Sequence, residues 1–174
     1  MSVILVILAV ILLALAYVLL FAREAVAPVS AFLGMACCYA ASCLPLNANI
    51  LLTWLCLTVI VTGVSLMQPR AVMQQRRGMG YITVGSLAGL AVGLLGFSVT
   101  TRLGAVYAFM VLGVVAGIFF GYYIFTRTPR GRAVSLSSGH FFSYLLAKGF
   151  PVAITTMQTG VLLVLLLARH ALFV

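Results

Sequence analysis

Acidic side chains are almost absent from this chain of 174 residues, which contains Glu24 and no aspartate. Charged residues of either sign make up only 6% of the sequence, whereas a soluble domain carries about 25%. A surface this poor in charge is unsuited to water, but it suits hydrocarbon, where a charge at mid-depth costs about 2.5 to 3.5 kcal/mol. The sequence therefore excludes a soluble globular protein and predicts an all-α integral membrane protein.

Catalytic groups are equally scarce. Acid–base chemistry with paired carboxylates needs two acids, and the chain has one. His140 and His170 lie near opposite ends of the final segment, and Ser137 and Ser138 beside His140 lack a nucleophile-elbow or oxyanion-hole motif. We predict that the protein is not an enzyme and that it has no catalytic residues and no cofactor.

The cysteines do not have the spacing of a metal or redox site. Cys37, Cys38, Cys43 and Cys56 form no C-x-x-C pair and lie in apolar stretches. Buried cysteines usually behave as small hydrophobic residues, and a metal cluster would need histidines or acids nearby as further ligands. We therefore expect no metal site.

Long hydrophobic runs dominate the rest of the sequence. A transmembrane helix needs about 20 apolar residues. The runs predict five to six spans in a single polytopic membrane domain, 1–174, at residues 3–22, 28–44, 50–67, 81–100, 103–125 and 141–168. The second run is short and rich in small residues, so it is either a tilted span or a re-entrant segment. The last is either one helix or an interfacial helix followed by a span.

Basic residues lie in the loops and at the span ends, chiefly in loops 68–80 and 126–140. The net charge of +9 does not indicate nucleic acid, because no basic run is interleaved with stacking aromatics. With the N-terminus outside, Arg102 and Arg169 fall outside, and the inner loops hold most of the arginines, as the positive-inside rule requires. The inner set is Arg23, Arg70, Arg76, Arg77, Arg127, Arg130 and Arg132. We expect the basic loops to contact anionic lipid headgroups.

Glycine recurs every fourth residue in the fourth and fifth spans. The two rows are Gly85, Gly89 and Gly93, and Gly113, Gly117 and Gly121. Each row lines one helix face, and small faces let helix backbones approach closely in lipid. We predict a glycine-zipper hairpin in which the rows pack against each other. The alternatives are a seam with a second copy or another membrane protein, and room for a ligand or a moving helix.

Lys148 interrupts the last hydrophobic segment, and an intramembrane cation is by default a candidate functional residue. Its ammonium would bind an anionic substrate or a lipid phosphate, helped by the arginines of the two basic loops. Those arginines are Arg76, Arg77, Arg127, Arg130 and Arg132. The alternative is snorkelling, in which the side chain reaches up to the headgroups.

Further along the same segment, polar side chains recur at Thr155, Gln158 and Thr159. Their spacing predicts a polar seam that faces other helices. Interhelical hydrogen bonds and a transport path both account for such a seam.

Several stretches resemble an uncharacterised bacterial membrane-protein family, domain of unknown function 456. The matching stretches are residues 27–34 with Pro28, 51–69 with Trp54 and Pro69, 80–121 with the glycine rows, and 148 onward. The family's proline- and glycine-rich turn is reduced here to Pro28, and Tyr122 and Tyr123 replace an expected acid. The resemblance implies a bacterial inner-membrane topology and supplies no catalytic residues.

Two functions fit these features. The first is a non-catalytic membrane subunit or scaffold that packs through its glycine-rich helices, as a homo-oligomer or with a membrane-complex partner. The alternative is a carrier, flippase or channel for an anionic or lipid-linked substrate that uses Lys148 and the arginine loops.

Overall fold

The fold is a bundle of apolar helices. The computed structural model describes residues 2–42, 44–67, 78–95, 103–129 and 145–171, and no strand occurs among them. The elements are α1 (Ser2–Ala22), α2 (Ala27–Ala40), α3 (Ala48–Leu66), α5 (Met79–Leu95), α6 (Leu103–Arg127), the π-helix η2 (Leu145–Gly149) and α9 (Phe150–Ala171). The predicted all-α membrane fold is confirmed.

The helix lengths suit a bilayer. Within the described residues, four segments are long and apolar enough to cross a membrane, namely Val3–Ala22, Ala48–Leu66, Gly104–Arg127 and Leu145–Leu167. Two shorter apolar helices, α2 and α5, have 14 and 17 residues. Large hydrophobic side chains such as Ile4 and Phe120 lie exposed on the outer faces of the bundle. Such an apolar exterior matches lipid rather than water.

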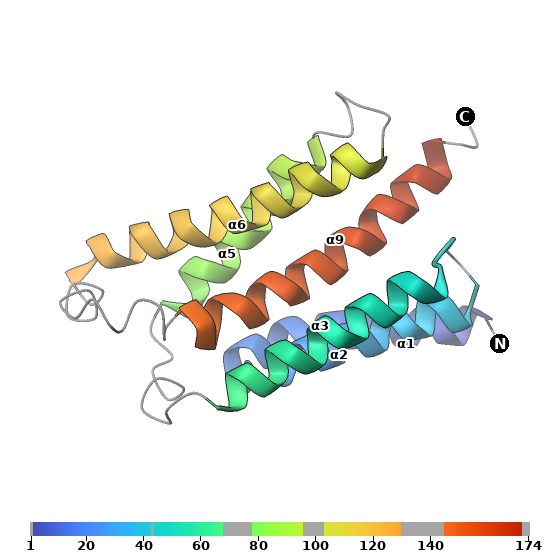
Figure 1. Ribbon diagram of the computed structural model, residues 1–174, viewed down its shortest axis with the longest axis horizontal. Coiled ribbons are helices and arrows are strands. Elements are labelled where there is room, and N and C mark those ends of the chain that lie inside the picture. Colours follow the sequence, from blue (N-terminus) through green and yellow to red (C-terminus); the bar gives the residue numbers. More distant parts are fainter. Residues whose placement is uncertain (1, 43, 68–77, 96–102, 130–144, 172–174) are drawn as a thin grey trace.

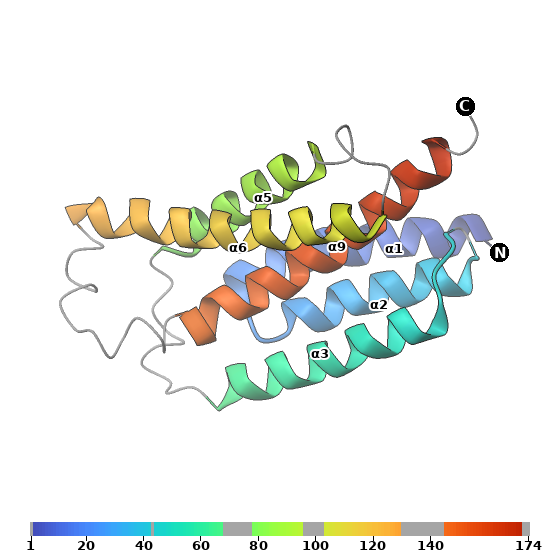
Figure 2. The same cartoon turned by 45° about the horizontal axis from the view of Figure 1, so that its top comes forward.

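The helices lie side by side along the long axis of the molecule and alternate in direction. Figures 1 and 2 show α1, α2 and α3 on one side, α5 and α6 on the other, and α9 between the two groups. The start of α1 and the end of α9 lie at one end of the bundle. The opposite end holds the α1–α2 turn, the end of α6 and the start of α9. We call it the basic end, because it carries Arg23 and Arg127.

Two described helix ends differ from the sequence prediction by three residues or more. Helix α2 ends at Ala40, short of the predicted 44, because Ser42 adopts a left-handed backbone conformation with φ of 51° and Pro45 follows soon after. At the C-terminal end, the predicted segment 141–168 is η2 followed by α9, which continues to Ala171. Residues 141–144 of that prediction and 96–100 of the fourth span lie outside the described part of the chain.

The glycine row of α5 faces the glycine row of α6 where the two helices pack together. These helices make the most extensive contact between any two described elements. A methyl group on Gly85 would collide with the carbonyl of Gly117, and one on Gly89 with the carbonyl of Gly113. At the far end of the row, a Cβ on Gly93 would lie 2.7 Å from the carbonyl oxygen of Phe109. The two backbones approach so closely that only glycine fits. Each glycine row is therefore covered by the other helix of the same chain.

Candidate functional site

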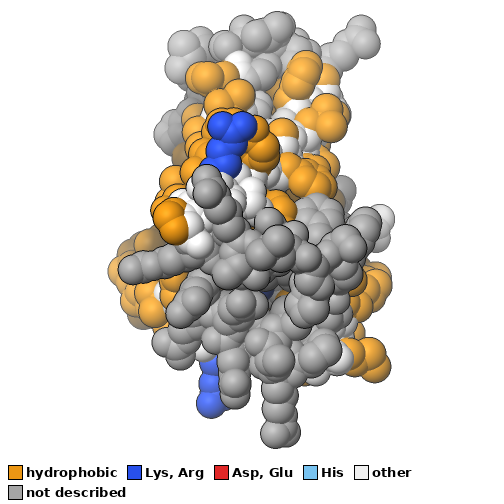
Figure 3. All heavy atoms as spheres, turned by 90° about the vertical axis from the view of Figure 1, so that its left-hand side faces the viewer, with side chains coloured by type: hydrophobic (Ala, Val, Ile, Leu, Met, Phe, Trp, Pro, Cys, Tyr) orange, Lys and Arg blue, Asp and Glu red, His pale blue; other side chains and the backbone are white. Residues whose placement is uncertain are grey.

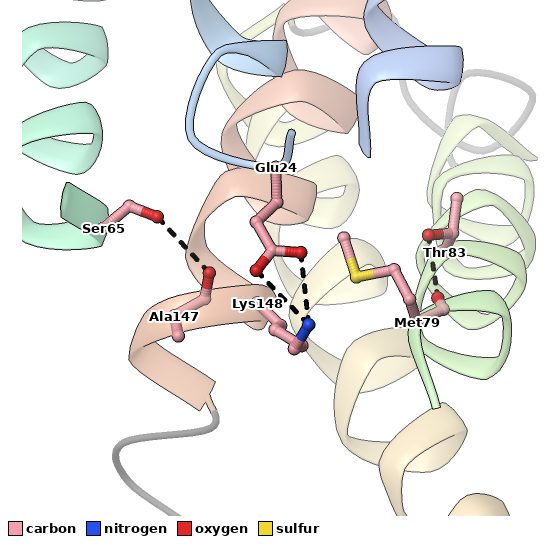
Figure 4. A network of polar contacts seen from close by, with 6 residues as sticks. All are labelled: Glu24, Ser65, Met79, Thr83, Ala147 and Lys148. Carbon is pink, nitrogen blue, oxygen red and sulfur yellow. Dashed lines mark hydrogen bonds and ion pairs between the residues drawn. The ribbon is translucent and has the colours of Figure 1, made fainter. Parts of the chain in front are cut away.

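A buried ion pair lies at the basic end. Lys148 Nζ lies 3.2 Å from Oε2 and 3.3 Å from Oε1 of Glu24 (Figure 4). The Lys148 side chain is 0% exposed and that of Glu24 is 11% exposed. These are the only lysine and the only acid of the whole sequence, and 124 positions separate them.

The local sequence explains the π-helical turn that contains Lys148. Pro151 has no N–H to donate to the carbonyl of Ala147 four residues earlier, so a regular α-helix cannot continue through this point. The chain forms the π-helix η2 here, and the Ala147 carbonyl lies 3.5 Å from Oγ of Ser65 on α3. Short π-helical turns of this kind occur frequently at functional sites.

Helix direction favours the acid at this position and disfavours the lysine. Lys148 lies at the N-terminal end of α9, where the partial positive charge of the helix dipole opposes a cation. Glu24 lies in the turn between α1 and α2, which brings its carboxylate to that same end. The Glu24 carboxylate therefore offsets the positive charge of the Lys148 ammonium and the partial positive charge of the α9 N-terminus.

Stability alone does not account for this pair. Removing two charges from water costs several kcal/mol per ion, and well-packed apolar residues are often as stable or more so in the same space. The buried pair is therefore treated as a candidate functional site. Ionisable residues inside membrane proteins typically pair with each other and mark substrate or ion pathways.

A cavity of about 280 Å³ lies beside Glu24 of the ion pair, and Lys148 is not among its lining residues. It is lined by residues 21–26 of the α1–α2 turn and by Leu66 of α3. Arg23 and Glu24 supply its charged groups. Its volume is near the lower limit of small-molecule pockets, about 300 Å³.

Polar contacts also connect α9 to its neighbours away from the pair. The amide Nε2 of Gln158 donates to Oγ1 of Thr58 on α3 at 2.8 Å, and Tyr17 of α1 donates to Thr159 at 3.2 Å. On the α5 side, the Thr156 hydroxyl lies 3.1 Å from that of Ser86. Of the three residues of the predicted polar seam, Gln158 and Thr159 form interhelical hydrogen bonds through their side chains.

The predicted anion-binding residues do not form one cluster in the described structure. Lys148 does not snorkel, because its ammonium is buried against Glu24. Arg127 is exposed at the end of α6, where its guanidinium lies 4.6 Å from the ring centre of Tyr123 and donates to the Tyr123 hydroxyl. Arg76, Arg77, Arg130 and Arg132 lie outside the described residues, as do Ser137, Ser138 and His140.

Figure 3 looks onto the basic end, where the upper of the visible basic side chains lies among hydrophobic ones. Among the described residues, no three His, Cys, Asp or Glu side chains are grouped so that they would hold a metal ion.

Sequence reasoning missed the role of Glu24, which it treated as part of a polar break. A signal was present, because a chain with one acid and one lysine in apolar surroundings stabilises both best by pairing them. The partner of Gln158 was also missed, since several threonines and serines on other helices were equally available.

No protein-family model, curated protein or solved structure matches this chain. The resemblance to domain of unknown function 456 therefore stays a prediction from the sequence.

Proposed function

We propose that this chain is a carrier of the bacterial inner membrane for an anionic, phosphate-bearing substrate, and that Lys148 is its binding cation. The observation that supports this most directly is the buried Lys148–Glu24 pair, whose Glu24 lines a cavity together with Arg23. A lysine is a common point-charge ligand for phosphate. The apolar surroundings strengthen its attraction for any anion that replaces water.

Glu24 acts in this proposal as an internal anion that occupies the place of the substrate. In the resting protein its carboxylate neutralises Lys148, so the buried site has no net charge. A substrate anion entering the cavity at Arg23 displaces the carboxylate from the ammonium. The site then remains paired with and without substrate, which limits the cost of burying charge in hydrocarbon.

The topology proposed for the carrier has six crossings, with both termini outside. The helices alternate in direction, and the start of α1 lies at the same end of the bundle as the end of α9. This arrangement supports an even number of crossings. The shared position of Arg23 and Arg127 at the basic end supports a cytoplasmic location for that end. Helix α2, at 14 residues, spans only about 21 Å, so the bilayer would thin beside it.

A scaffold or subunit role is the other function that the sequence allows. Its main support was the pair of glycine rows, which would offer a surface for another protein. The rows pack against each other instead, so they offer no such surface. The carrier proposal therefore uses features that the scaffold proposal leaves unexplained.

Ligand-dependent melting of the purified protein in detergent tests the carrier proposal. The probes are inorganic phosphate and glycerol phosphate, with chloride at matched ionic strength as the reference. A ligand that binds only the folded state raises the melting temperature, and we expect a rise of about 2 to 4 °C. In the neutral-pair variant, which combines Glu24→Gln with Lys148→Met, the rise should disappear.

The Arg102→Gln variant is the matched control, because it removes one cation from the opposite predicted side. It should keep the wild-type response to both probes. A wild-type protein that responds to neither probe, or a neutral-pair variant that responds as the wild type does, would overturn the proposal.

A further inference from the structure

Three buried side-chain oxygen atoms on α3 and α9 have no hydrogen-bond partner among the residues that the structure describes. They are Oγ1 of Thr62, Oγ1 of Thr155 and Oε1 of Gln158. The side chains of Thr155 and Gln158 are both 0% exposed. A buried polar atom without a partner costs about 1 to 3 kcal/mol, so each of the three requires an explanation.

The two threonines differ from the other hydroxyls on the helices. A helical threonine usually donates to the carbonyl four residues earlier. Among the described residues, Thr53, Thr58, Thr83 and Thr159 do so. No such bond is formed by Thr62 or Thr155, whose hydroxyls are left for another partner.

The orientation of the Gln158 amide follows from its neighbour. The Thr58 hydroxyl donates its one proton to the Trp54 carbonyl at 2.7 Å. The atom of Gln158 that faces this hydroxyl must therefore donate, so it is the nitrogen, at 2.8 Å. The amide oxygen of Gln158 consequently points away from Thr58 and can only accept.

Helix register places the three oxygens in one seam. Two hydrogen bonds, from Ser65 of α3 to the Ala147 carbonyl of η2 and from Gln158 of α9 to Thr58 of α3, show that α3 runs antiparallel to the η2–α9 segment. Thr62 lies between the two contacts on α3, and Thr155 lies between them on α9. Thr58, Thr62 and Ser65 are also four and three residues apart, so they share one helix face.

The chemistry of these atoms selects the ligand. An acceptor-only amide oxygen excludes an anion at that position and favours a cation. Hard cations prefer oxygen ligands, but calcium and magnesium sites are built with carboxylates. The only acid of the chain is Glu24, which is engaged with Lys148 at the basic end. Neutral oxygens without a carboxylate therefore suit a monovalent ion.

We propose that Thr62, Thr155 and Gln158 bind a monovalent alkali cation, sodium or potassium, in the seam between α3 and α9. Two of the three residues, Thr155 and Gln158, lie near the middle of the candidate span Leu145–Leu167. Carriers commonly bind their coupling ions at mid-depth. This inference rests on the carrier proposal for its purpose, but the site itself does not use Lys148.

Thermal melting in sodium, potassium or choline chloride at equal ionic strength tests the site, with no phosphate present. Choline is too large to enter, so it provides the reference. We expect sodium or potassium to raise the melting temperature of the wild type by about 2 to 4 °C over choline. Thr155→Val, which replaces the hydroxyl with a methyl group of similar size, should remove that difference.

Thr53→Val is the matched control, because Thr53 is exposed on α3 and its hydroxyl donates to the Asn49 carbonyl. It should keep the full difference between the alkali cations and choline. Equal melting in all three salts would overturn the cation site and leave water as the partner of the three oxygens. If both Thr155→Val and Thr53→Val lost the melting-temperature difference between the alkali cations and choline, the cation site would also be overturned.

The two proposals fail separately. The neutral-pair variant should keep its response to the cation while it loses the response to phosphate. Thr155→Val should lose its response to the cation while it keeps the response to phosphate. A Thr155→Val variant that keeps the cation response overturns the cation site alone, whatever its response to phosphate.

Discussion

Lys148 Nζ lies 3.2 Å from Oε2 of Glu24, so the only lysine and the only acid of the sequence meet inside an apolar bundle. Neither residue would be stable there alone, because an isolated buried charge is strongly destabilising. Each side chain therefore depends on the other. In the carrier proposal, a substrate anion that binds Lys148 must neutralise its ammonium in place of the Glu24 carboxylate.

Removing one charge of this pair should cost far more stability than removing both. Lys148→Met leaves the carboxylate of Glu24 without its ammonium and should destabilise the protein by about 3 kcal/mol. The neutral-pair variant should recover most of that loss. Unfolding titrations in mixed detergent measure the free energy of unfolding of each variant. If the loss in the double variant equals the sum of the losses in Glu24→Gln and Lys148→Met, the two residues do not interact.

Glycine-to-alanine changes should separate the packed glycines from the open ones. Gly89→Ala directs a methyl group at the Gly113 carbonyl, so α5 and α6 must move apart at a cost of about 1 to 3 kcal/mol. Gly80→Ala and Gly104→Ala meet nothing within 4 Å and should have almost no effect. Melting temperatures of the three variants check this, and equal losses would contradict the close approach of the two helices.

The contact between Gln158 and Thr58 should make a measurable but modest contribution. Interhelical hydrogen bonds in membranes contribute about 0.6 kcal/mol on average. A double-mutant cycle with Thr58→Val and Gln158→Met should give a coupling energy of that order. A coupling of zero would show that the bond does not hold α3 to α9.

Cysteine labelling should reveal the sidedness of the proposed six crossings. In a variant without native cysteines, Pro129→Cys at the basic end should react with a membrane-impermeant thiol reagent only in inverted vesicles. Asn49→Cys, which is exposed at the start of α3, should react only from outside. Labelling of both from the same side would contradict the proposed topology.

The sequence was informative wherever one dominant force decides the structure. Hydrophobic runs set the helices, and close backbone packing in lipid explains why the rows of Gly85 and Gly113 meet. The end of α2 was harder to predict, because it depends on the backbone of Ser42 rather than on hydropathy. The same holds for η2, whose form follows from the missing N–H of Pro151 and the position of Ser65.

The site could be predicted only in part, because it depends on which residues become neighbours. Lys148 was recognisable from its place in an apolar segment. Its partner was not, since Glu24 lies 124 positions away and could equally have faced the headgroups. The unpartnered oxygens of Thr62 and Thr155 are visible only once the register between α3 and α9 is known.

Transport by the protein in liposomes tests the central claim most directly. Labelled inorganic phosphate and a fluorescent phosphatidylglycerol distinguish a soluble substrate from a lipid one. The account predicts that wild-type protein moves at least one of them across the bilayer and that the neutral-pair variant, although folded and inserted, moves neither. Equal movement by both proteins, or no movement of either probe by the wild type, would contradict it.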